Sequence, residues 1–502
     1  MSTHDRAHPR VAVIGSGFGG IGMAMQLKRA GIESFTILEK SDRLGGTWRD
    51  NTYPGAACDS ASFGYCFSFE QKTDWSRKWS PQAEILAYLE ACARKYDLAA
   101  HTRFNAEVVR ARFDEAAGVW RLRLAGGATL EAEVLVSGVG QLNRPATPDI
   151  PGLADFRGTT FHSARWDHAA DLAGKRVVVV GNAASAIQFI PQIAPVVGRL
   201  TILQRSANWM LPKRDRAYRA WEKRMFARFP LSARLYRWWM WMVYESMFPL
   251  FRGHELTSRF YARVAKRVMR REIPDPALQR ALLPDYPIGG KRILISDDYY
   301  PTLRRENVEV VTDPIARVTA DGVETAGGRT MPADVIILAT GFQTTDFLVP
   351  MAIEGLGGRK LHDVWREGAE AYLGMTVAGF PNFFMLYGPN TNLGHNSIIF
   401  MLECQIRYVV QCIQALAAEN LTYLDVRRDV QQAFNRRLQA DLARSVWART
   451  PRSWYKRADG RITNNWSGPT IAYWWQTRHP DLGFYRQVAR ARPVESEVAA
   501  VA

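Results

Sequence analysis

The stretch that decides the fold lies at residues 11–20 and reads VAVIGSGFGG, an apolar run that passes into a glycine-rich turn. Residues 21–30 have the composition of a helix, so strand, turn and helix follow in the order of a nucleotide-binding βαβ unit. Gly15 allows a tight turn, Gly17 lets the backbone approach a pyrophosphate, and Gly20 lets helix and strand pack closely. This unit predicts a bound dinucleotide.

The residue that ends the next strand indicates which dinucleotide is held. The apolar run at residues 34–38 is followed by Glu39, whose carboxylate can accept hydrogen bonds from an adenosine ribose. Paired glycines follow at residues 45–46, where the backbone can approach a flavin. The first unit is therefore interpreted as an FAD site. The further contacts that we expect there are Gly46, Thr47 and Trp48.

A second unit of the same kind begins with VVVV at residues 177–180 and continues into the turn GNAASAIQ at residues 181–188. Ala183 replaces the second glycine of the usual pattern, and we expect its methyl group to weaken nucleotide binding or to shift the nucleotide outward. The next strand, residues 200–203, leads to Arg205, and a guanidinium there suits the 2′-phosphate of NADPH. The second unit therefore predicts NADPH. Its expected contacts are Gly181, Ala183, Ser185, Gln188 and Arg205.

These two units predict an α/β architecture with two Rossmann-like dinucleotide-binding domains. A buried strand at residues 335–338 leads into Thr340 and Gly341, where we expect the chain to return to the FAD domain and contact the cofactor. The expected FAD domain comprises residues 1–150 and 330–502, with the NADPH domain at residues 151–329 between them.

Residues 209–283 depart from the alternation of strand and helix, and we expect a helical insertion in the NADPH domain. Aromatic residues crowd the part from Trp238 to Phe251, which Glu245 interrupts. This part is too short to cross a bilayer as a helix. Two interpretations stay open: a lid or plain packing over the active site, which we favour, or a patch that lies on a membrane surface. Either suits a large apolar substrate.

Composition narrows the class of partner. The formal charge of +16, from 65 basic and 49 acidic residues, favours anionic partners, and two anionic cofactors account for it. Without an RNA-binding motif or zinc-finger spacing, we expect neither a nucleic-acid partner nor a metal site. Five cysteines without a C-x-x-C pair favour a reducing compartment. The segment of residues 1–9 is short and polar, so we expect no secretory signal. We expect a cytoplasmic protein, either free or in peripheral contact with a membrane.

A segment between the two units resembles a known family. Residues 156–167, FRGTTFHSARWD, are similar to the F-x-G-x-x-x-H-x-x-x-W-[PD] fingerprint of Baeyer–Villiger monooxygenases, which are class B flavoprotein monooxygenases. Related enzymes that oxidise nitrogen or sulfur carry a similar segment but usually lack its ending. The resemblance extends from about Val11 to Phe342. It places His162 in a catalytic or a hinge role, of which the hinge role is favoured.

The same resemblance implies the catalytic residues. Residues 53–59, YPGAACD, resemble the segment whose aspartate lies near the flavin, and residues 287–292, PIGGKR, resemble the one that carries the nucleotide-binding lysine and the active-site arginine. By this resemblance Asp59 pairs with Arg292, and Lys291 reaches the NADPH phosphate. Trp466 is a candidate for substrate contact, because the matching region in relatives often lines the substrate side of the flavin.

The predicted function is an FAD- and NADPH-dependent monooxygenase that converts a small apolar ketone and O2 to an ester or lactone through a C4a-peroxyflavin. Such a reaction needs a fixed positive charge beside the peroxide anion, which Arg292 would supply. The alternatives are an N- or S-oxygenating flavin monooxygenase or a long-chain hydrocarbon hydroxylase and, from another class, a non-oxygenating NADPH oxidase or sensor. The sequence does not specify the substrate or the oligomeric state.

Overall fold

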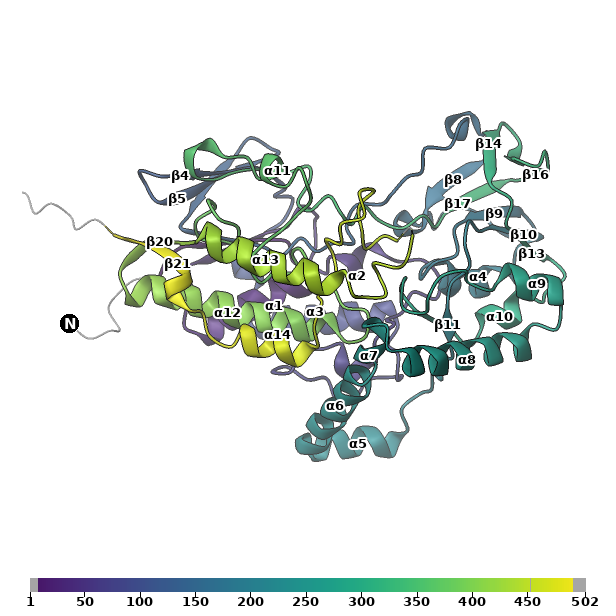
Figure 1. Cartoon of the computed structure of the whole chain (residues 1–502), viewed down its shortest axis with the longest axis horizontal. Coiled ribbons are helices and arrows are strands. Elements are labelled where there is room, and N and C mark those ends of the chain that lie inside the picture. The colour runs from purple at the N-terminus through teal and green to yellow at the C-terminus, as the bar shows by residue number, and fades with distance from the viewer. Residues whose placement is uncertain (1–7, 452, 491–502) are drawn as a thin grey trace, which may run out of the picture.

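The computed structural model describes residues 8–451 and 453–490. Most of the N-terminal segment in which we expect no secretory signal lies outside these residues. Within them, two parallel five-stranded sheets form the core, which confirms the predicted α/β class with two Rossmann-like domains. The first sheet has the strand order β19-β7-β1-β2-β3, and the second, at the right of Figure 1, has the order β13-β10-β9-β17-β8.

The strands of the first sheet are β1 (Val11–Ile14), β2 (Phe35–Leu38), β3 (Thr102–Arg103), β7 (Val134–Ser137) and β19 (Phe383–Met385). Those of the second are β8 (Thr159–His162), β9 (Arg176–Val180), β10 (Arg199–Leu203), β13 (Val308–Val311) and β17 (Val335–Leu338). All four residues of β1, β7 and β17 are buried, because helices or other segments cover both faces of a parallel sheet.

At the carboxyl end of both sheets, a glycine of the turn lies close to the backbone that follows a neighbouring strand. Gly15 has a φ of +95°, and a Cβ atom there would lie 2.9 Å from the carbonyl oxygen of Gly138, directly after β7. Gly181 has a φ of +109°, and a Cβ atom there would lie 2.4 Å from the carbonyl oxygen of Ala339, directly after β17. Each turn thus needs glycine for its conformation and for space. Both turns open at the crevice where dinucleotides bind to such sheets.

Strand β17 changes one expected boundary. It pairs in parallel with β9 and β8, so it belongs to the second sheet, whereas the expected FAD domain resumes at residue 330. The three-stranded sheet of β14 (Ile315–Thr319), β15 (Gly322–Thr325) and β16 (Thr330–Pro332) also precedes it on the same side. We therefore place the return to the FAD domain at about Ala339. A four-residue buried strand carries no mark of the sheet to which it belongs, and only its pairing decides this.

Further elements complete both domains. The long helix α12 (Ile398–Ala418) packs on α1 (Phe18–Arg29) in the largest hydrophobic cluster. Of the helices in the described part of the chain, α12 is also the one whose length and apolar composition would suffice to cross a membrane, and 56% of that window is buried in the protein. The other helices of the FAD domain are α2 (Thr47–Asp50), α3 (Gln82–Lys95), α11 (Leu361–Val364), α13 (Arg428–Leu442) and α14 (Thr470–Gln476). Those of the second domain outside its insertion are α4 (Ala186–Ile193) and α10 (Tyr299–Thr302).

Smaller sheets lie outside the two parallel ones. They contain β4 (Val108–Asp114), β5 (Val119–Leu124), β6 (Thr129–Ala132) and β18 (Ala352–Glu354) in one sheet, β14 (Ile315–Thr319), β15 (Gly322–Thr325) and β16 (Thr330–Pro332) in another, and β20 (Leu421–Val426) with β21 (Tyr485–Ala489) in a third. Short 3-10 turns occupy Ser62–Gly64, Ala99–His101, Leu153–Asp155, Ser163–Arg165, Leu356–Gly358 and Leu482–Phe484. All five cysteines are buried free thiols.

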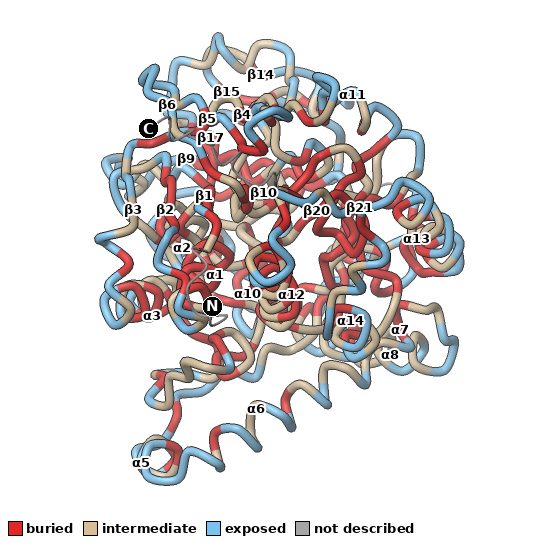
Figure 2. The backbone as a smooth tube through the Cα atoms, turned by 90° about the vertical axis from the view of Figure 1, so that its left-hand side faces the viewer, coloured by how far each residue is buried: buried red, intermediate tan, exposed pale blue. Residues whose placement is uncertain are grey.

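The expected insertion is helical. It contains α5 (Ala220–Arg228), α6 (Pro230–Glu245), α7 (Phe248–Phe251), α8 (Glu255–Glu272) and α9 (Pro276–Ala281). Strands β11 (Met210–Leu211) and β12 (Leu294–Ile295) flank the insertion and pair with each other, which brings the two ends of the insertion together. Helices α5 and α6 project from the body of the molecule at the lower edge of Figures 1 and 2.

Candidate active site

A cavity of about 800 Å³ opens between the two parallel sheets and gathers most of the predicted site residues. Its wall combines the first turn, the second turn and the segments around Asp59 and Arg292, which are remote in sequence. The predicted residues on this wall are Gly15, Gly17, Glu39, Gly46, Thr47, Trp48, Asp59, Ala183, Ser185, Gln188, Lys291, Arg292, Thr340 and Gly341. Gly20, Gly181, Arg205, His162 and Trp466 are not on it.

The first turn and the paired glycines face one another across this cavity. A Cβ atom on Gly46 would lie 3.0 Å from the Cα atom of Gly17, and one on Gly20 would overlap the carbonyl oxygen of Gly15. The bare backbone at Gly17 and Gly46 leaves room for a ligand where side chains would fill the space. Helix α1 begins at Phe18, so its free N–H groups point into the same region. These features fit a bound pyrophosphate.

Glu39 lies at the end of β2, as expected, with its side chain buried. Its carboxylate accepts hydrogen bonds from the backbone N–H of Ser16 at 2.9 Å and from the Ser16 hydroxyl at 2.7 Å. Its other oxygen accepts from Arg49 Nη1 at 3.1 Å and from the N–H of Ser41 at 3.0 Å. Glu39 therefore orients the first turn as well as lining the cavity. The sequence analysis missed Arg49, because an arginine ten residues from the acid carries no motif.

The second turn is tied to the FAD domain. The amide oxygen of Gln188 accepts from the Tyr53 hydroxyl at 3.0 Å and from the N–H of Ala57 at 3.2 Å, and its amide nitrogen donates to the Ala57 carbonyl at 3.0 Å. A Cβ atom on Gly55 would lie 2.6 Å from the Gln188 carbonyl oxygen, so the two segments are in close contact. Gln188, expected at the nucleotide, thus also connects the two domains beside Asp59.

Two cations stand at the outer end of the second turn. Lys291 Nζ donates to the Ser206 hydroxyl at 2.7 Å and lies 4.4 Å from the centre of the Tyr286 ring. Burial and, after it, the nearby charge of Arg205 lower the pKa of Lys291. Two like charges that repel one another across a loop favour an anion between them. This arrangement fits the predicted 2′-phosphate contacts, and the side chain of Arg205 is exposed.

Asp59 and Arg292 form an ion pair on the cavity wall. Arg292 Nε donates to Asp59 Oδ2 at 2.6 Å, and the two side chains are 33% and 31% exposed. Burial alone would raise the pKa of Asp59, but the charge and hydrogen bond of Arg292 outweigh burial and lower that pKa. Burial alone would lower the pKa of Arg292, but the charge and hydrogen bond of Asp59 outweigh burial and raise that pKa. Both groups stay charged at neutral pH.

Two tyrosines near Arg292 did not stand out in the sequence as partners of the arginine. Burial raises the pKa of Tyr455 to about 12, although the positive charge of Arg292 opposes this. Burial raises the pKa of Tyr387 as well, again against the charge of Arg292. The Tyr387 hydroxyl donates to Asn392 Oδ1 at 2.7 Å, and Asn392 Nδ2 donates to Asn465 Oδ1 at 2.8 Å. Two neutral phenols thus lie near the guanidinium.

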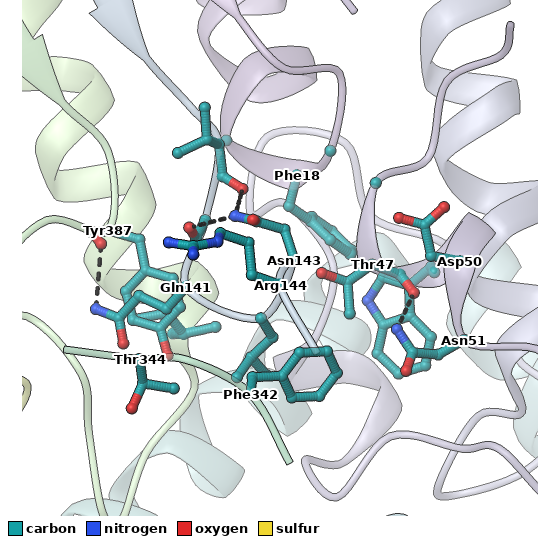
Figure 3. A pocket seen from close by; sticks show the side chains of 18 of the residues that line it. Phe18, Thr47, Asp50, Asn51, Gln141, Asn143, Arg144, Phe342, Thr344 and Tyr387 are labelled. Atoms are coloured by element: carbon teal, nitrogen blue, oxygen red, sulfur yellow. Dashed lines mark hydrogen bonds between the residues drawn. The ribbon is translucent and has the colours of Figure 1, made fainter. Parts of the chain in front are cut away.

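Figure 3 shows polar side chains of the cavity that the sequence analysis also missed. Gln141 Nε2 donates to the Tyr387 carbonyl at 3.2 Å, and Asn143 Nδ2 donates to the carbonyl of Val139 at 2.9 Å. Arg144 lies beside them on the segment that follows β7. No motif marks this loop, and only the strand order brings it to the cavity.

His162 ends β8, at the junction where β17 leaves the second sheet. Its Nδ1 accepts from the N–H of Ala164 at 3.0 Å, and its buried Nε2 has no hydrogen-bond partner among the described residues. Burial lowers the pKa of His162, and the nearby backbone of Gly341 opposes this shift. The ring lies 6.2 Å from that of Phe342. A position beside the link between domains, off the cavity wall, favours the hinge role over the catalytic one.

Trp466 is not at the cavity, in contrast to the expected substrate contact. It is 5% exposed, its ring stacks on Phe434 at 6.4 Å, and its Nε1 donates to the Pro469 carbonyl at 3.2 Å. Gly468 packs against the indole. The residue therefore belongs to the packed interior around α13 and α14. An aromatic cluster in the sequence does not distinguish a pocket wall from a core.

Comparisons with known proteins agree with this geometry. The pyridine nucleotide-disulphide oxidoreductase family matches residues 12–228. A Baeyer–Villiger monooxygenase from Pseudomonas aeruginosa is 44% identical over 480 residues, which cover 95% of this chain and 91% of that protein. A steroid monooxygenase bound to NADP is 29% identical with a TM-score of 0.85, covering 96% of this chain and 100% of the other. A crystal structure of OTEMO in complex with FAD and NADP is 28% identical with a TM-score of 0.84, covering 94% of this chain and 97% of the other. The chain therefore belongs to the Baeyer–Villiger monooxygenases, within the NADPH-dependent flavoprotein monooxygenases.

Proposed function

We propose that the protein uses FAD and NADPH to insert one oxygen atom of O2 into small apolar ketones, giving esters or lactones. The observation that carries this proposal is the ion pair of Asp59 and Arg292 on the wall of the cavity that also holds both nucleotide-binding turns. An enzyme that oxidises nitrogen or sulfur with an electrophilic oxygen has no need for a cation at this place. The names of the relatives support the same reaction class.

The residues that would hold the two cofactors follow from the site. Gly15, Gly17 and Gly46 would cradle the FAD pyrophosphate, with Glu39 toward its ribose. Arg205 and Lys291 would hold the 2′-phosphate of NADPH, and we place its pyrophosphate at Ala183. FAD held there would, once reduced by NADPH, supply the two electrons that activate O2.

The chain's own contribution is electrostatic. The guanidinium of Arg292 keeps its proton throughout the working pH range, and it therefore stabilises negative charge that develops on oxygen when a carbonyl carbon is attacked. Asp59 fixes the orientation of Arg292 through the 2.6 Å hydrogen bond. Since Asp59 is itself ionised, it also tempers the positive charge of Arg292.

Product analysis under ¹⁸O₂ tests this proposal. The purified protein, with NADPH, is given a panel of cyclic ketones, thioethers and tertiary amines. We expect an ester or lactone that carries a single ¹⁸O atom, formed from a ketone faster than any sulfoxide or N-oxide is formed. Formation of sulfoxides or N-oxides alone would assign the heteroatom reaction, and consumption of NADPH with only hydrogen peroxide as product would assign an oxidase.

We also propose a cytoplasmic location, which the five buried free thiols support because a reducing compartment keeps cysteines unpaired.

A further inference from the structure

Helix α6 has two faces with different surroundings. One face is fastened to the FAD domain: Arg237 Nη1 donates to the carbonyls of Phe63 and Cys66 at 2.6 and 2.7 Å. Farther along the helix, Trp241 Nε1 donates to the Thr470 hydroxyl at 3.0 Å, and Glu245 accepts from the N–H of Thr470 at 2.6 Å. This face is therefore packed against the FAD domain.

Another face of α6 carries large apolar side chains in solvent, together with Trp221 near the start of α5 and Phe229 between the two helices, each between 43% and 64% exposed. Positions 231, 235, 238, 239 and 242 recur at helical spacing and so share one face. Figures 1 and 2 show α5 and α6 projecting from the body, and within residues 8–451 and 453–490 the rest of the chain leaves these side chains exposed. Its members, which we call the outer face, are Trp221, Phe229, Leu231, Leu235, Trp238, Trp239, Met242 and Val243.

Charges beside the outer face are of one sign. Arg224, Arg228 and Arg234 are exposed, and among the described residues none of them has a carboxylate partner. The two acids of α5 and α6 are engaged inward: Glu222 binds Arg216 through two hydrogen bonds at 2.8 and 2.7 Å, and Glu245 binds Thr470. The surface that projects is therefore apolar and basic.

We propose that the outer face docks on an anionic lipid surface, with the apolar side chains in the interface and the arginines toward the headgroups. Projecting apolar and basic residues without acids are the composition of an interfacial helix. A second copy of the chain fits less well, because a twofold contact would bring the same arginines of both copies together. Docking here is independent of the reaction.

A second cavity offers a route by which a substrate dissolved in the lipid reaches the first cavity; this consequence of docking rests on the proposed function. The second cavity has a volume of about 550 Å³ and lies between α6, α12 and α14. Trp238, Trp241 and Phe400 line it, and it shares Asn396 and Ser397 with the wall of the first cavity. A ketone dissolved in the lipid could enter along the docked helix without crossing water.

Vesicle sedimentation of the full-length, FAD-loaded protein, without NADPH or ketone, tests the docking. We expect the protein to sediment with vesicles of phosphatidylcholine and phosphatidylglycerol in equal parts and to bind vesicles of phosphatidylcholine alone far less. The double variant Leu231→Glu/Leu235→Glu should lose binding, and Arg224→Gln/Arg228→Gln should weaken it about 25-fold, since each basic residue near such a surface contributes roughly fivefold. Val196→Glu, at an equally exposed apolar residue of the same domain outside its helical insertion, is the matched control and should bind as the wild type.

The results separate the alternatives. A wild-type protein that stays in solution with the anionic vesicles overturns the proposal, as does a Leu231→Glu/Leu235→Glu variant that still sediments. A wild-type dimer that this variant splits into monomers, seen by light scattering without vesicle binding, assigns the outer face to a second copy instead. For the entry route, the same variant should oxidise a water-soluble ketone at the wild-type rate and a vesicle-dissolved ketone several-fold more slowly. Equal rates on the vesicle-dissolved ketone overturn the entry route and leave the docking result intact.

Discussion

Replacement of Arg292 by alanine should separate flavin reduction from ketone oxidation. The variant removes the cation that pairs with Asp59 on the cavity wall, whereas the two glycine-rich turns are untouched. Loss of one preorganised charge partner costs on the order of 100-fold to 1000-fold in rate, or about 2.7–4 kcal/mol of transition-state stabilisation. We expect ester formation to fall by that factor and NADPH to reduce the flavin within about threefold of the wild-type rate.

The effect on stability should be smaller. The Arg292 to Asp59 hydrogen bond is short and charge-assisted, which is worth about 1.5–3 kcal/mol, but both side chains are about one-third exposed, and solvent screening reduces the loss to roughly 1–2 kcal/mol. The wild-type pKa of Asp59 is lowered, so the pair stabilises the fold above the unfolded pKa of about 3.9, and this stability is lost as the pH falls through the folded pKa. Without Arg292 burial raises that pKa, and the difference in melting temperature between the two proteins should therefore be larger at pH 8 than at pH 5.

Two assays and one control decide the outcome. Anaerobic stopped-flow absorbance of the flavin measures reduction, and gas chromatography measures the ester. Arg292→Lys retains the charge but not the hydrogen bond from Nε, and it should recover part of the rate. Ester formation within threefold of the wild type in Arg292→Ala would refute the electrostatic role. An equal loss of flavin reduction would move Arg292 to cofactor binding.

Three further predictions concern the nucleotide site and the core. Arg205→Ala should raise the KM for NADPH at least tenfold with little change in that for NADH, because only NADPH carries the 2′-phosphate; steady-state kinetics with both nucleotides check this, and equal shifts would remove Arg205 from the role. Ala183→Gly should lower the KM for NADPH several-fold by removing a methyl group from the wall of the nucleotide crevice, whereas an unchanged or higher KM would show that the methyl group does not obstruct the nucleotide. Burial raises the pKa of Asp425 to about 6, so the folded protein binds a proton there more tightly than the unfolded chain does. The folded state therefore loses stability as the pH rises from about 4 through 6. Calorimetry should show that the Asp425→Asn variant melts at a higher temperature than the wild type at pH 8, and that the difference between their melting temperatures is smaller at pH 4.5.

The sequence by itself determined the parts of the site that are local. Gly15, Gly17 and Glu39 lie within one strand, turn and strand, and the conformation that such a unit adopts depends on neighbours along the chain. The same holds for the second turn at Gly181. For this reason the two dinucleotide-binding domains and the helical nature of residues 209–283 could be predicted, and the structure confirms the two-domain fold.

Contacts between distant segments needed the tertiary structure. Asp59 and Arg292 are 233 residues apart, and on the residues alone they are two surface charges; the family resemblance predicted the pair, and the fold shows the hydrogen bond. The resemblance also predicted that Trp466 contacts the substrate, but in the structure Trp466 packs on Phe434 away from the cavity. Gln188 proved to connect domains, a role set by the docking of α4 on the segment before Asp59.

The pairing of β17 and the exposure of α6 were likewise decided in three dimensions. A buried four-residue strand has the same composition in either sheet, and hydrogen bonds to β9 and β8 alone assign it to the second. The sequence of an aromatic helix does not show whether its apolar side chains are covered or in solvent, because burial depends on what packs against each face. The sequence thus determines each element from its neighbours along the chain, and the tertiary structure decides which elements meet.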